Sequence, residues 1–313
     1  MLSYYAVMQD GSEVELTAVR SAVIDCDVDV PAASARLLLS YDARLRNNAR
    51  VLTAKDGADT VFCGDIDSIV SETDSRGAIM KLSARSAASR LLDNEAEPLD
   101  YRDPSAELIC RRHAKPFGLI VADGDRSYLP ERMRIQKGMS HWQVLECFCR
   151  AKYNSTPHVS ADGTLYLKGL PPGDTAVFDN SGAGIPYHSL KESRNLYRLL
   201  SDIRIKTKAT GGYSSVSVNP NPGCGGIVRR RYVDVSADNR SMDTVRQMLD
   251  ASNRRGYLLS LSCGGCCTHL VGSSAEVRDT VLGVISDLTV SGVRYKANSG
   301  GEFSEITFKK EKF

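Results

Sequence analysis

The stretch TVFCGDIDSIV, residues 60–70, alternates apolar and polar side chains over the length of a β-strand. A period of two indicates a strand with one buried face. The same alternation recurs on both sides of it, at residues 5–8, 14–19, 21–28, 49–54 and 77–85. Turn-forming residues separate these stretches, at Asp10-Gly11, Asp56-Gly57 and residues 75–77. Short strands at this spacing predict a β-sandwich or barrel over residues 1–95.

The pattern changes after Glu95. A helix is predicted from Pro104 onward, with Asp103 as its N-cap and the proline at the first helical position. A second helix is predicted after Ser140, which would cap it. Its apolar side chains recur at helical spacing, at Trp142, Val144, Leu145, Phe148 and Cys149. A hairpin on the Asp162-Gly163 turn completes a small α/β module over residues 96–170.

The remainder of the chain, residues 171–313, returns to β patterns. Residues 171–186 are rich in proline and glycine and are interpreted as a linker or surface loop. Strands are predicted from Asn195, and residues 210–226 as a loop. A helix over 241–255 is predicted with Ser241 as cap and Gly256 beyond its end. The tail is predicted to be strands, including one over residues 266–271. The fold class is therefore mainly β with an α+β insertion, in domains 1–95, 96–170 and 171–313.

Composition narrows the function classes. The chain has 313 residues, with 40 Lys and Arg against 38 Asp and Glu, a net charge of +2. Such a balance provides no large positive field for wrapping nucleic acid. No apolar run approaches the ~18 residues that a transmembrane helix needs. The start has no basic segment before an apolar run, so we expect no secretory signal. A membrane protein, an exported toxin and a coiled-coil fibre are excluded.

Nine cysteines are present, an odd number for a disulfide framework. We expect reduced thiols, many of them acting as small apolar residues. The densest cluster is Cys263-Gly-Gly-Cys266-Cys267-Thr-His269. A zinc site needs about four ligands, so this cluster would require further ligands, from Cys224 or from Cys147 with Cys149. The favoured interpretation is a two-residue hairpin turn at Gly264-Gly265 that places Cys263 opposite Cys266.

Other candidate sites have equally ordinary interpretations. Three carboxylates alternate along residues 25–29 (Asp25, Asp27 and Asp29) and form either a weak cation site or, more favourably, a solvated strand face. Two basic runs are present, Arg229–Arg231 and Lys309, Lys310 and Lys312. The arginine run has one adjacent aromatic, Tyr232, and is interpreted as a rim contact or a solvated strand. The five histidines are dispersed, and no metalloprotease, nucleophile-elbow or phosphate-loop motif is present. Trp142 is expected to anchor the core of the module. No residue is assigned a catalytic, cofactor-binding or metal role, and contact with other proteins is the favoured function.

Several segments resemble the baseplate hub proteins of contractile phage tails. In that family a strand reading F-x-G-x-I/V is followed by a strand that ends in an Arg-Ser step and leads into L-L-D-N. Here these are Phe62-Cys-Gly64-Asp-Ile66, residues 77–86 ending in Arg85-Ser86, and Leu91-Leu-Asp-Asn94. The module matches at residues 116–119, 137–145 and 158–167, and the tail at 292–296 and 300–308. These segments are most similar to the hubs of defective prophages, tailocins and myophages of Gram-positive hosts. Those hubs are similar to the late control protein D group.

This resemblance implies two tail-tube-like antiparallel β-barrels and a small α/β module in each chain. It implies a homotrimer that joins a hexameric tail tube, or its initiator protein, to a trimeric spike, with the tape measure and other baseplate proteins as further partners. Assembly in the bacterial cytoplasm into a virion or tailocin is expected on this resemblance. We expect no enzymatic activity, cofactor, nucleic-acid site or membrane segment. The cysteine-rich segment and the loop at 219–226 depart from the family. The alternatives are a cell-wall hydrolase or protease at the tail tip, or a metal-binding module built on the cysteines.

Overall fold

The computed structural model describes residues 1–75, 77–122, 124–171, 173–207, 211–235 and 242–310. The predicted cap Ser241 and the basic residue Lys312 lie outside this part of the chain. The chain divides into two compact units. Unit 1 comprises residues 1–174, 264–273 and 291–305, and unit 2 comprises residues 175–263, 274–290 and 306–313. The division into domains 1–95, 96–170 and 171–313 stays a prediction.

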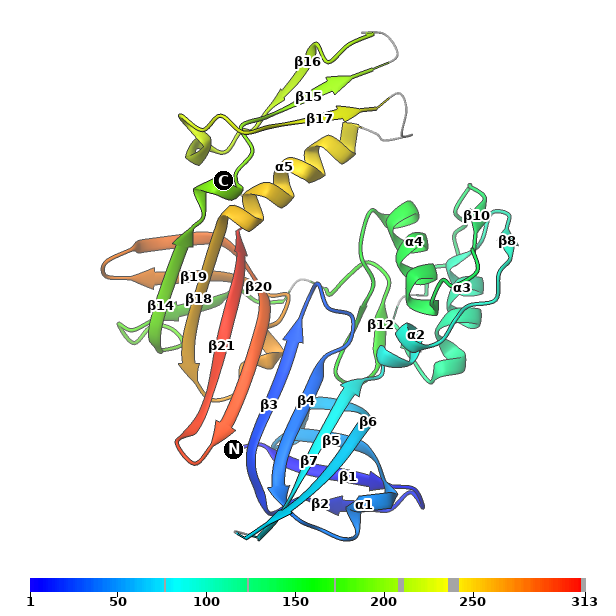
Figure 1. Ribbon diagram of the computed structural model, residues 1–313, viewed down its shortest axis with the longest axis vertical. Coiled ribbons are helices and arrows are strands. Elements are labelled where there is room, and N and C mark those ends of the chain that lie inside the picture. Colours follow the sequence, from blue (N-terminus) through cyan, green and yellow to red (C-terminus); the bar gives the residue numbers. More distant parts are fainter. Residues whose placement is uncertain (76, 123, 172, 208–210, 236–241, 311–313) are drawn as a thin grey trace. The chain divides into compact units, whose positions relative to one another are not determined.

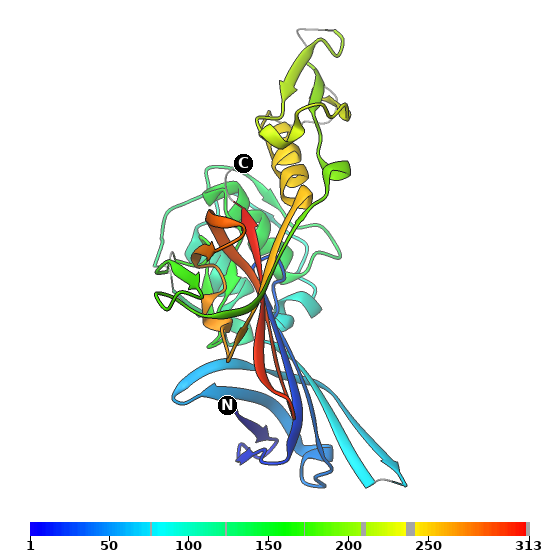
Figure 2. The same ribbon diagram turned by 90° about the vertical axis from the view of Figure 1, so that its left-hand side faces the viewer.

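Unit 1 begins with an antiparallel sheet in the order β20-β3-β4-β7-β6-β5-β1-β2 (Figure 1). Its strands and one short helix are β1 (Ser3–Met8), β2 (Glu13–Glu15), β3 (Val19–Asp27), β4 (Ser34–Ser40), α1 (Leu45–Asn48), β5 (Ala49–Asp56), β6 (Asp59–Asp74), β7 (Gly77–Ser86) and the C-terminal half of β20 (Gly283–Asn298). Alternate residues enter one core, as the period of two predicts; Ile24, Leu37, Leu52, Phe62 and Leu82 are buried there. Figure 2 shows the outer halves of β6 and β7 projecting beyond the neighbouring strands.

The α/β module of unit 1 has a separate core around two helices. Its elements are α2 (Ser89–Asp93), β8 (Asp100–Tyr101), α3 (Ala106–His113), η1 (Lys115–Phe117), β9 (Ile120–Val121), β10 (Met133–Arg134), α4 (His141–Tyr153), β11 (His158–Val159) and β12 (Thr164–Tyr166). The stripe predicted on α4 is confirmed, because all five of its side chains are buried, Trp142 among them. The hairpin at Asp162-Gly163 is also confirmed, since β11 and β12 pair antiparallel across it.

The start of α3 corrects one expectation. The helix begins at Ala106, and its N-cap is Ser105, whose hydroxyl accepts the backbone N–H of Leu108. Asp103 lies before the helix, at φ +42°, so it is not the cap. Two residues able to cap flank Pro104, and the local sequence does not distinguish them.

Ser140 caps α4 as predicted, in a capping box with Gln143. The Ser140 hydroxyl accepts the Gln143 backbone N–H at 3.2 Å, and the Gln143 side chain accepts the Ser140 backbone N–H at 2.8 Å. We expect Ser140→Ala to lower the free energy of unfolding by about 1 kcal/mol. Urea unfolding followed by the fluorescence of Trp142, the single tryptophan, measures this. Ser140→Asp keeps a capping oxygen and should recover most of the loss; an equal loss in both variants would contradict the role of the cap.

Unit 2 contains a second group of strands, in the order β14-β18-β21-β20, with β19 paired to β20 and β13 paired to β19. The elements are β13 (Ala176–Asp179), β14 (Tyr187–Arg194), η2 (Leu196–Arg198), β15 (Asp202–Lys206), β16 (Ser215–Val218), η3 (Pro222–Cys224), β17 (Arg230–Asp234), α5 (Met242–Gly256), β18 (Tyr257–Gly264), β19 (Ser274–Asp279) and parts of β20 and β21 (Gly301–Lys310). Strands β15, β16 and β17 form a separate sheet against α5.

Several boundaries in this unit differ from the sequence expectation. The region 171–186, predicted as a linker, contains strand β13, and the loop predicted over 210–226 contains strand β16. The chain from Leu196 to Arg198 is a 3₁₀ turn and not the start of a strand. In unit 1, residues 266–271 are not a strand, because Thr268–Leu270 form the 3₁₀ turn η4. Strands of four residues within Gly- and Pro-rich sequence carry too little periodicity to be found locally.

The predicted fold class, mainly β with an α/β insertion, is confirmed by this architecture. The large sheet is predominantly antiparallel, with one parallel pair between β13 and β19. Within the described ranges, no helix has the length and apolar character needed to cross a bilayer.

Candidate functional site

The strands that carry the F-x-G-x-I motif meet at an unusually close approach. Gly64 of β6 pairs with Ser86 of β7 and with Leu52 of β5. A Cβ atom at position 64 would lie 2.1 Å from the carbonyl oxygen of Arg85. No side chain is compatible with this distance, so only glycine fits between the two neighbouring strands. Gly64 therefore allows β6 to lie this close to the end of β7, which is where the chain enters the α/β module.

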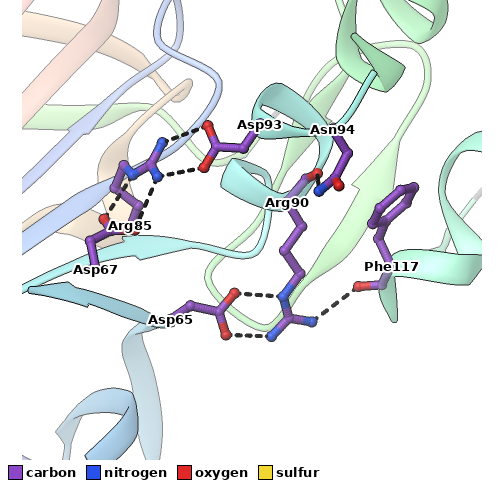
Figure 3. Close-up of polar contacts among 7 residues, drawn as sticks. All are labelled: Asp65, Asp67, Arg85, Arg90, Asp93, Asn94 and Phe117. Carbon is purple, nitrogen blue, oxygen red and sulfur yellow. Dashed lines mark hydrogen bonds and ion pairs between the residues drawn. The ribbon is translucent and has the colours of Figure 1, made fainter. Parts of the chain in front are cut away.

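Arg85, the arginine of the Arg-Ser step, joins three elements (Figure 3). Its guanidinium donates to Asp67 of β6 from Nε at 2.7 Å and from Nη2 at 3.0 Å. It also donates to Asp93 of α2 from Nη1 at 3.2 Å and from Nη2 at 2.6 Å. These hydrogen bonds raise the pKa of Arg85 and lower the pKa of Asp93. Two bidentate pairs on one guanidinium hold α2 at the end of the β6–β7 ribbon.

Arg90 makes a parallel connection from α2 (Figure 3). Its guanidinium binds Asp65 of β6 through two hydrogen bonds of 2.6 Å and donates to the carbonyl oxygen of Phe117 at 3.0 Å. The hydrogen bonds with Asp65 raise the pKa of Arg90. The side chain of Asn94 in turn donates to the carbonyl oxygen of Arg90 at 2.8 Å. We call these residues the arginine clamp; its members are Asp65, Asp67, Arg85, Arg90 and Asp93.

The clamp brings together residues from the three segments that carry the resemblance. Asp65 and Asp67 alternate on β6 beside the motif glycine, Arg85 ends β7, and Asp93-Asn94 ends α2. All three segments carry the resemblance to tail proteins, but no role for these residues is predicted from the sequence. The signal available in the sequence was the i, i+2 spacing of the two aspartates, which places both on one face of a strand. Their partners depend on strand register and are not visible in the sequence.

Replacing Arg85 by lysine tests the clamp. A lysine ammonium cannot form two bidentate pairs, so we expect the free energy of unfolding of the α/β module to fall by about 1 kcal/mol at low salt. The difference should shrink in ~1 M salt, where charges are screened within about 3 Å. Trp142 fluorescence during urea unfolding reports this module directly. Arg44→Lys is the matched control, since Arg44 pairs only locally with Asp42, and it should unfold like the wild type. Equal losses in both variants would argue against the clamp.

A buried histidine pair lies inside the module. His113 of α3 is 3% exposed, and its Nδ1 lies 2.9 Å from Nδ1 of His141, the first residue of α4. The hydroxyl of Tyr101 lies 2.9 Å from Nε2 of His113. Burial, together with the neighbouring His141 and Arg112, lowers the pKa of His113 to about 4, and burial also lowers the pKa of His141. The pair is therefore neutral at pH 7 and connects the N-terminus of one helix to the C-terminus of the other.

The cysteine cluster is arranged differently from the sequence expectation. Cys263 lies within β18 opposite Tyr187 of β14, so Gly264-Gly265 do not form a two-residue hairpin that pairs Cys263 with Cys266. The chain instead leaves the strand, and the backbone N–H of Cys267 donates to the Ser304 hydroxyl at 3.0 Å. All nine cysteines lie in the described ranges as thiols. Among the described residues, no group of three His, Cys, Asp or Glu side chains is placed to hold a metal ion.

Part of the cluster lines a cavity of about 310 Å³ in unit 1. Cys266 and His269 lie there with Asp27, Cys26 and His158. Burial raises the pKa of Cys26 to about 12 and also raises the pKa of Cys266, while it lowers the pKa of His158. These thiols are therefore protonated at neutral pH, and a protonated thiol is neither a good nucleophile nor a metal ligand.

Several of the charged candidates are engaged in ion pairs or hydrogen bonds. Asp25 binds Arg36 at 3.0 Å and also Arg294, which places it between two neighbouring strands. Arg230 binds Asp202 at 3.1 Å. The Arg229 guanidinium donates to the carbonyl oxygens of Leu196 and Leu199. These contacts agree with the interpretation of Asp25 and of the arginine run as charged residues on strand faces. The carboxylate of Asp27 accepts the backbone N–H of Asp29 at 2.7 Å.

The structure of this chain is similar to solved structures of known proteins. No family model and no curated protein matches the sequence. The tail protein from Neisseria meningitidis MC58 is similar with a TM-score of 0.74 and 18% identity, over 99% of this chain and 97% of that one. The 43 kDa tail protein of prophage MuSo2 from Shewanella oneidensis has a TM-score of 0.76 at 13% identity, over 98% of each chain. The fold is that of phage tail proteins.

A further similarity extends to a secretion system. The E. coli c3393 protein, a component of the type VI secretion system that itself resembles phage T4 tail proteins, has a TM-score of 0.54 at 8% identity. The match covers 94% of this chain and 73% of that one. The tail-protein fold thus takes in both β-rich ends of the chain and the module that the arginine clamp attaches.

Proposed function

We propose that this chain is the structural baseplate hub of a contractile tail or related injection particle. In this role it is a trimeric adaptor between a hexameric tail tube and a trimeric spike, of the late control protein D type. The observation that carries the proposal is the similarity to a phage tail protein over 99% of this chain and 97% of that chain. A match over nearly the full length of both chains places all parts of this chain, and not a single shared module, within a tail-protein architecture.

Symmetry provides the physical reason for the trimer. A hexameric tube ends in six equivalent positions, whereas a spike has three-fold symmetry, and a closed ring between them has to satisfy both. A chain with two tail-tube-like β-barrels, one from each β-rich end, presents six barrels in a trimer. Open strand edges would then pair between subunits and not remain exposed to aggregation.

The proposed partners are the tail tube or its initiator, the spike, the tape measure protein and other baseplate proteins. The particle, a phage or a tailocin, would be assembled in the bacterial cytoplasm. The role is mechanical, and the arginine clamp supports it, because a force-bearing adaptor needs its module attached by more than a flexible chain. Three bidentate carboxylate pairs, two on Arg85 and one on Arg90, provide such an attachment.

Cryo-electron microscopy of particles from the native host tests the proposal. We expect three copies of this chain in one ring between tube and spike, with two barrels from each copy. Six copies in the ring, or one barrel from each copy, would contradict it. Zymography of the purified protein on peptidoglycan should show no clearing; a cleared zone would support the alternative of a cell-wall hydrolase at the tail tip.

A further inference from the structure

The small sheet of unit 2 has one covered face and one open face. Residues Ile203, Ile205 and Val233 of this sheet pack with Val245 and Leu249 of α5 in a single core. Figure 1 shows α5 lying along one side of β15, β16 and β17. Because side chains of a strand alternate between faces, the residues between these positions belong to the opposite face.

Strand register identifies the members of the opposite face. Val218 lies beside Asp202, Val216 lies beside Arg204, and Arg204 lies beside Tyr232 on its other flank. We call this surface the open face; its members are Asp202, Arg204, Val216, Val218, Arg230 and Tyr232. Val218 is 70% exposed and Tyr232 is 61% exposed, although both are large apolar side chains. Exposed apolar residues gathered on one sheet face are typical of an interaction surface.

The charge of the open face is positive. Asp202 is buried and accepts Nε of Arg204 at 3.2 Å and Nε of Arg230 at 3.1 Å. One carboxylate thus holds two guanidiniums. Tyr232 is braced by Tyr213, with ring centroids 5.3 Å apart. Tyrosine and arginine are enriched in protein-binding surfaces, where they surround an apolar centre. A nucleic-acid strand is disfavoured, because β16 offers two valines and no stacking ring.

A second exposed apolar feature of unit 2 has the opposite charge. The turn between β19 and β20 displays Val281, which is 87% exposed, and Leu282. The start of β20 adds Val284, which is 66% exposed. We call Asp279–Val284 the acidic tip. Over residues 276–287 the chain has three carboxylates and one guanidinium, and that guanidinium, of Arg278, is paired with Glu276.

The acidic tip is rigid. The carboxylate of Asp279 accepts the backbone N–H of Val281 at 2.9 Å and of Leu282 at 2.8 Å through Oδ1. The hydroxyl of Tyr187 donates to its other oxygen at 2.6 Å. A turn held in one conformation loses little entropy when it binds, so its apolar side chains are presented ready for a complementary surface.

We infer that the acidic tip of one copy docks on the open face of a second copy. The high exposure of Val218 and Val281 means that neither feature is covered within its own chain. In this contact Val281 of the acidic tip packs against Val218 of the open face. Asp279 then approaches the guanidiniums of the open face. The contact is head-to-tail, the type that closes into a ring. The inference rests on the proposed role as a ring subunit and specifies which surfaces meet there.

The predicted contact is weak in isolation. Strands of four or five residues provide an open face on the order of 300 Å², below the ~800 Å² per partner of a stable interface. We therefore expect association at high protein concentration and strengthening in a closed ring, where each copy makes two such contacts.

Photo-crosslinking tests the contact directly. The probe is the full chain with p-benzoylphenylalanine in place of Val218, irradiated at about 1 mM, where a weak complex is populated. Mass spectrometry should map crosslinked dimers to residues 279–284 of the second copy. A crosslink to another segment of a second copy would overturn the inference while leaving the ring role intact. No crosslinked product would also overturn it, and the copy number in particles would then decide the ring role separately.

Charge variants provide the control. Val218→Glu and Val281→Lys should each reduce self-association in sedimentation velocity at least about fivefold, a free-energy change of about 1 kcal/mol. The double variant places a glutamate opposite a lysine and should recover most of the association. Val30→Glu changes an exposed valine of unit 1 and should have no effect. Loss in the single variants without recovery in the double variant, or equal loss in the Val30 control, would overturn the pairing.

Discussion

Replacing Gly64 by alanine is expected to destabilise the protein by more than about 3 kcal/mol. The new methyl group would lie 2.1 Å from the carbonyl oxygen of Arg85 and 2.8 Å from the Phe62 ring. The carbonyl belongs to a paired strand and cannot rotate away, so β6 has to separate from β7. The arginine clamp would separate with it, because Asp65 and Asp67 follow Gly64 on the same strand. Urea unfolding with circular dichroism measures the β-sheet, and Trp142 fluorescence measures the module.

Gly124→Ala is the matched control. Gly124 also lies in unit 1, but a Cβ there would meet no atom within 4 Å. We expect its unfolding free energy to stay within about 0.5 kcal/mol of the wild type. A Gly64→Ala protein as stable as the Gly124→Ala protein would show that the close approach between β6 and Arg85 does not require glycine.

Acidification is expected to weaken the α/β module through His113. In the unfolded chain this histidine takes a proton near its ordinary pKa of 6.5, whereas in the fold its pKa is about 4. The unfolded state therefore binds more protons between these values. The stability that the neutral histidine contributes is complete above pH 6.5 and is lost as pH falls toward 4. The full difference is about 3 kcal/mol.

The hydrogen bonds give the structural reason for this loss. Between the two Nδ1 atoms, one nitrogen has to donate and the other has to accept, so His113 and His141 cannot both be protonated while they stay 2.9 Å apart. Unfolding of the module, followed by Trp142 fluorescence in urea at a series of pH values, should show the decline. Trp142 lies in the same core as α3 and is therefore a local probe.

His113→Gln isolates the effect. Glutamine keeps a donor and an acceptor near Tyr101 but has no titrating group, so the pH-dependent loss should become about 2 kcal/mol smaller. His188→Gln is the control, because His188 is an exposed residue of β14 in unit 2. In this variant the α/β module should show the same decline with falling pH as in the wild type. A wild-type decline in His113→Gln would assign the acid sensitivity to other groups.

The sequence alone determined the local features of this protein. The period-two stretch at 60–70 became β6, the helical stripe around Trp142 became the buried face of α4, and Ser140 became its cap. Each depends on side chains a few residues apart, whose spacing dictates which face is buried. The mainly β class followed from such local signals, and the likeness to phage tail proteins followed from the resemblance of short segments.

The tertiary structure alone decided which distant residues meet. β13 pairs with β19 across nearly a hundred residues, Cys263 lies opposite Tyr187 and not Cys266, and His113 meets His141 across 28 positions. The clamp likewise needs the register of β6 on β7 before Arg85 can reach Asp67. Strand register and helix packing minimise the energy of the whole core, so residues far apart in the chain become neighbours without leaving a pattern in either local segment.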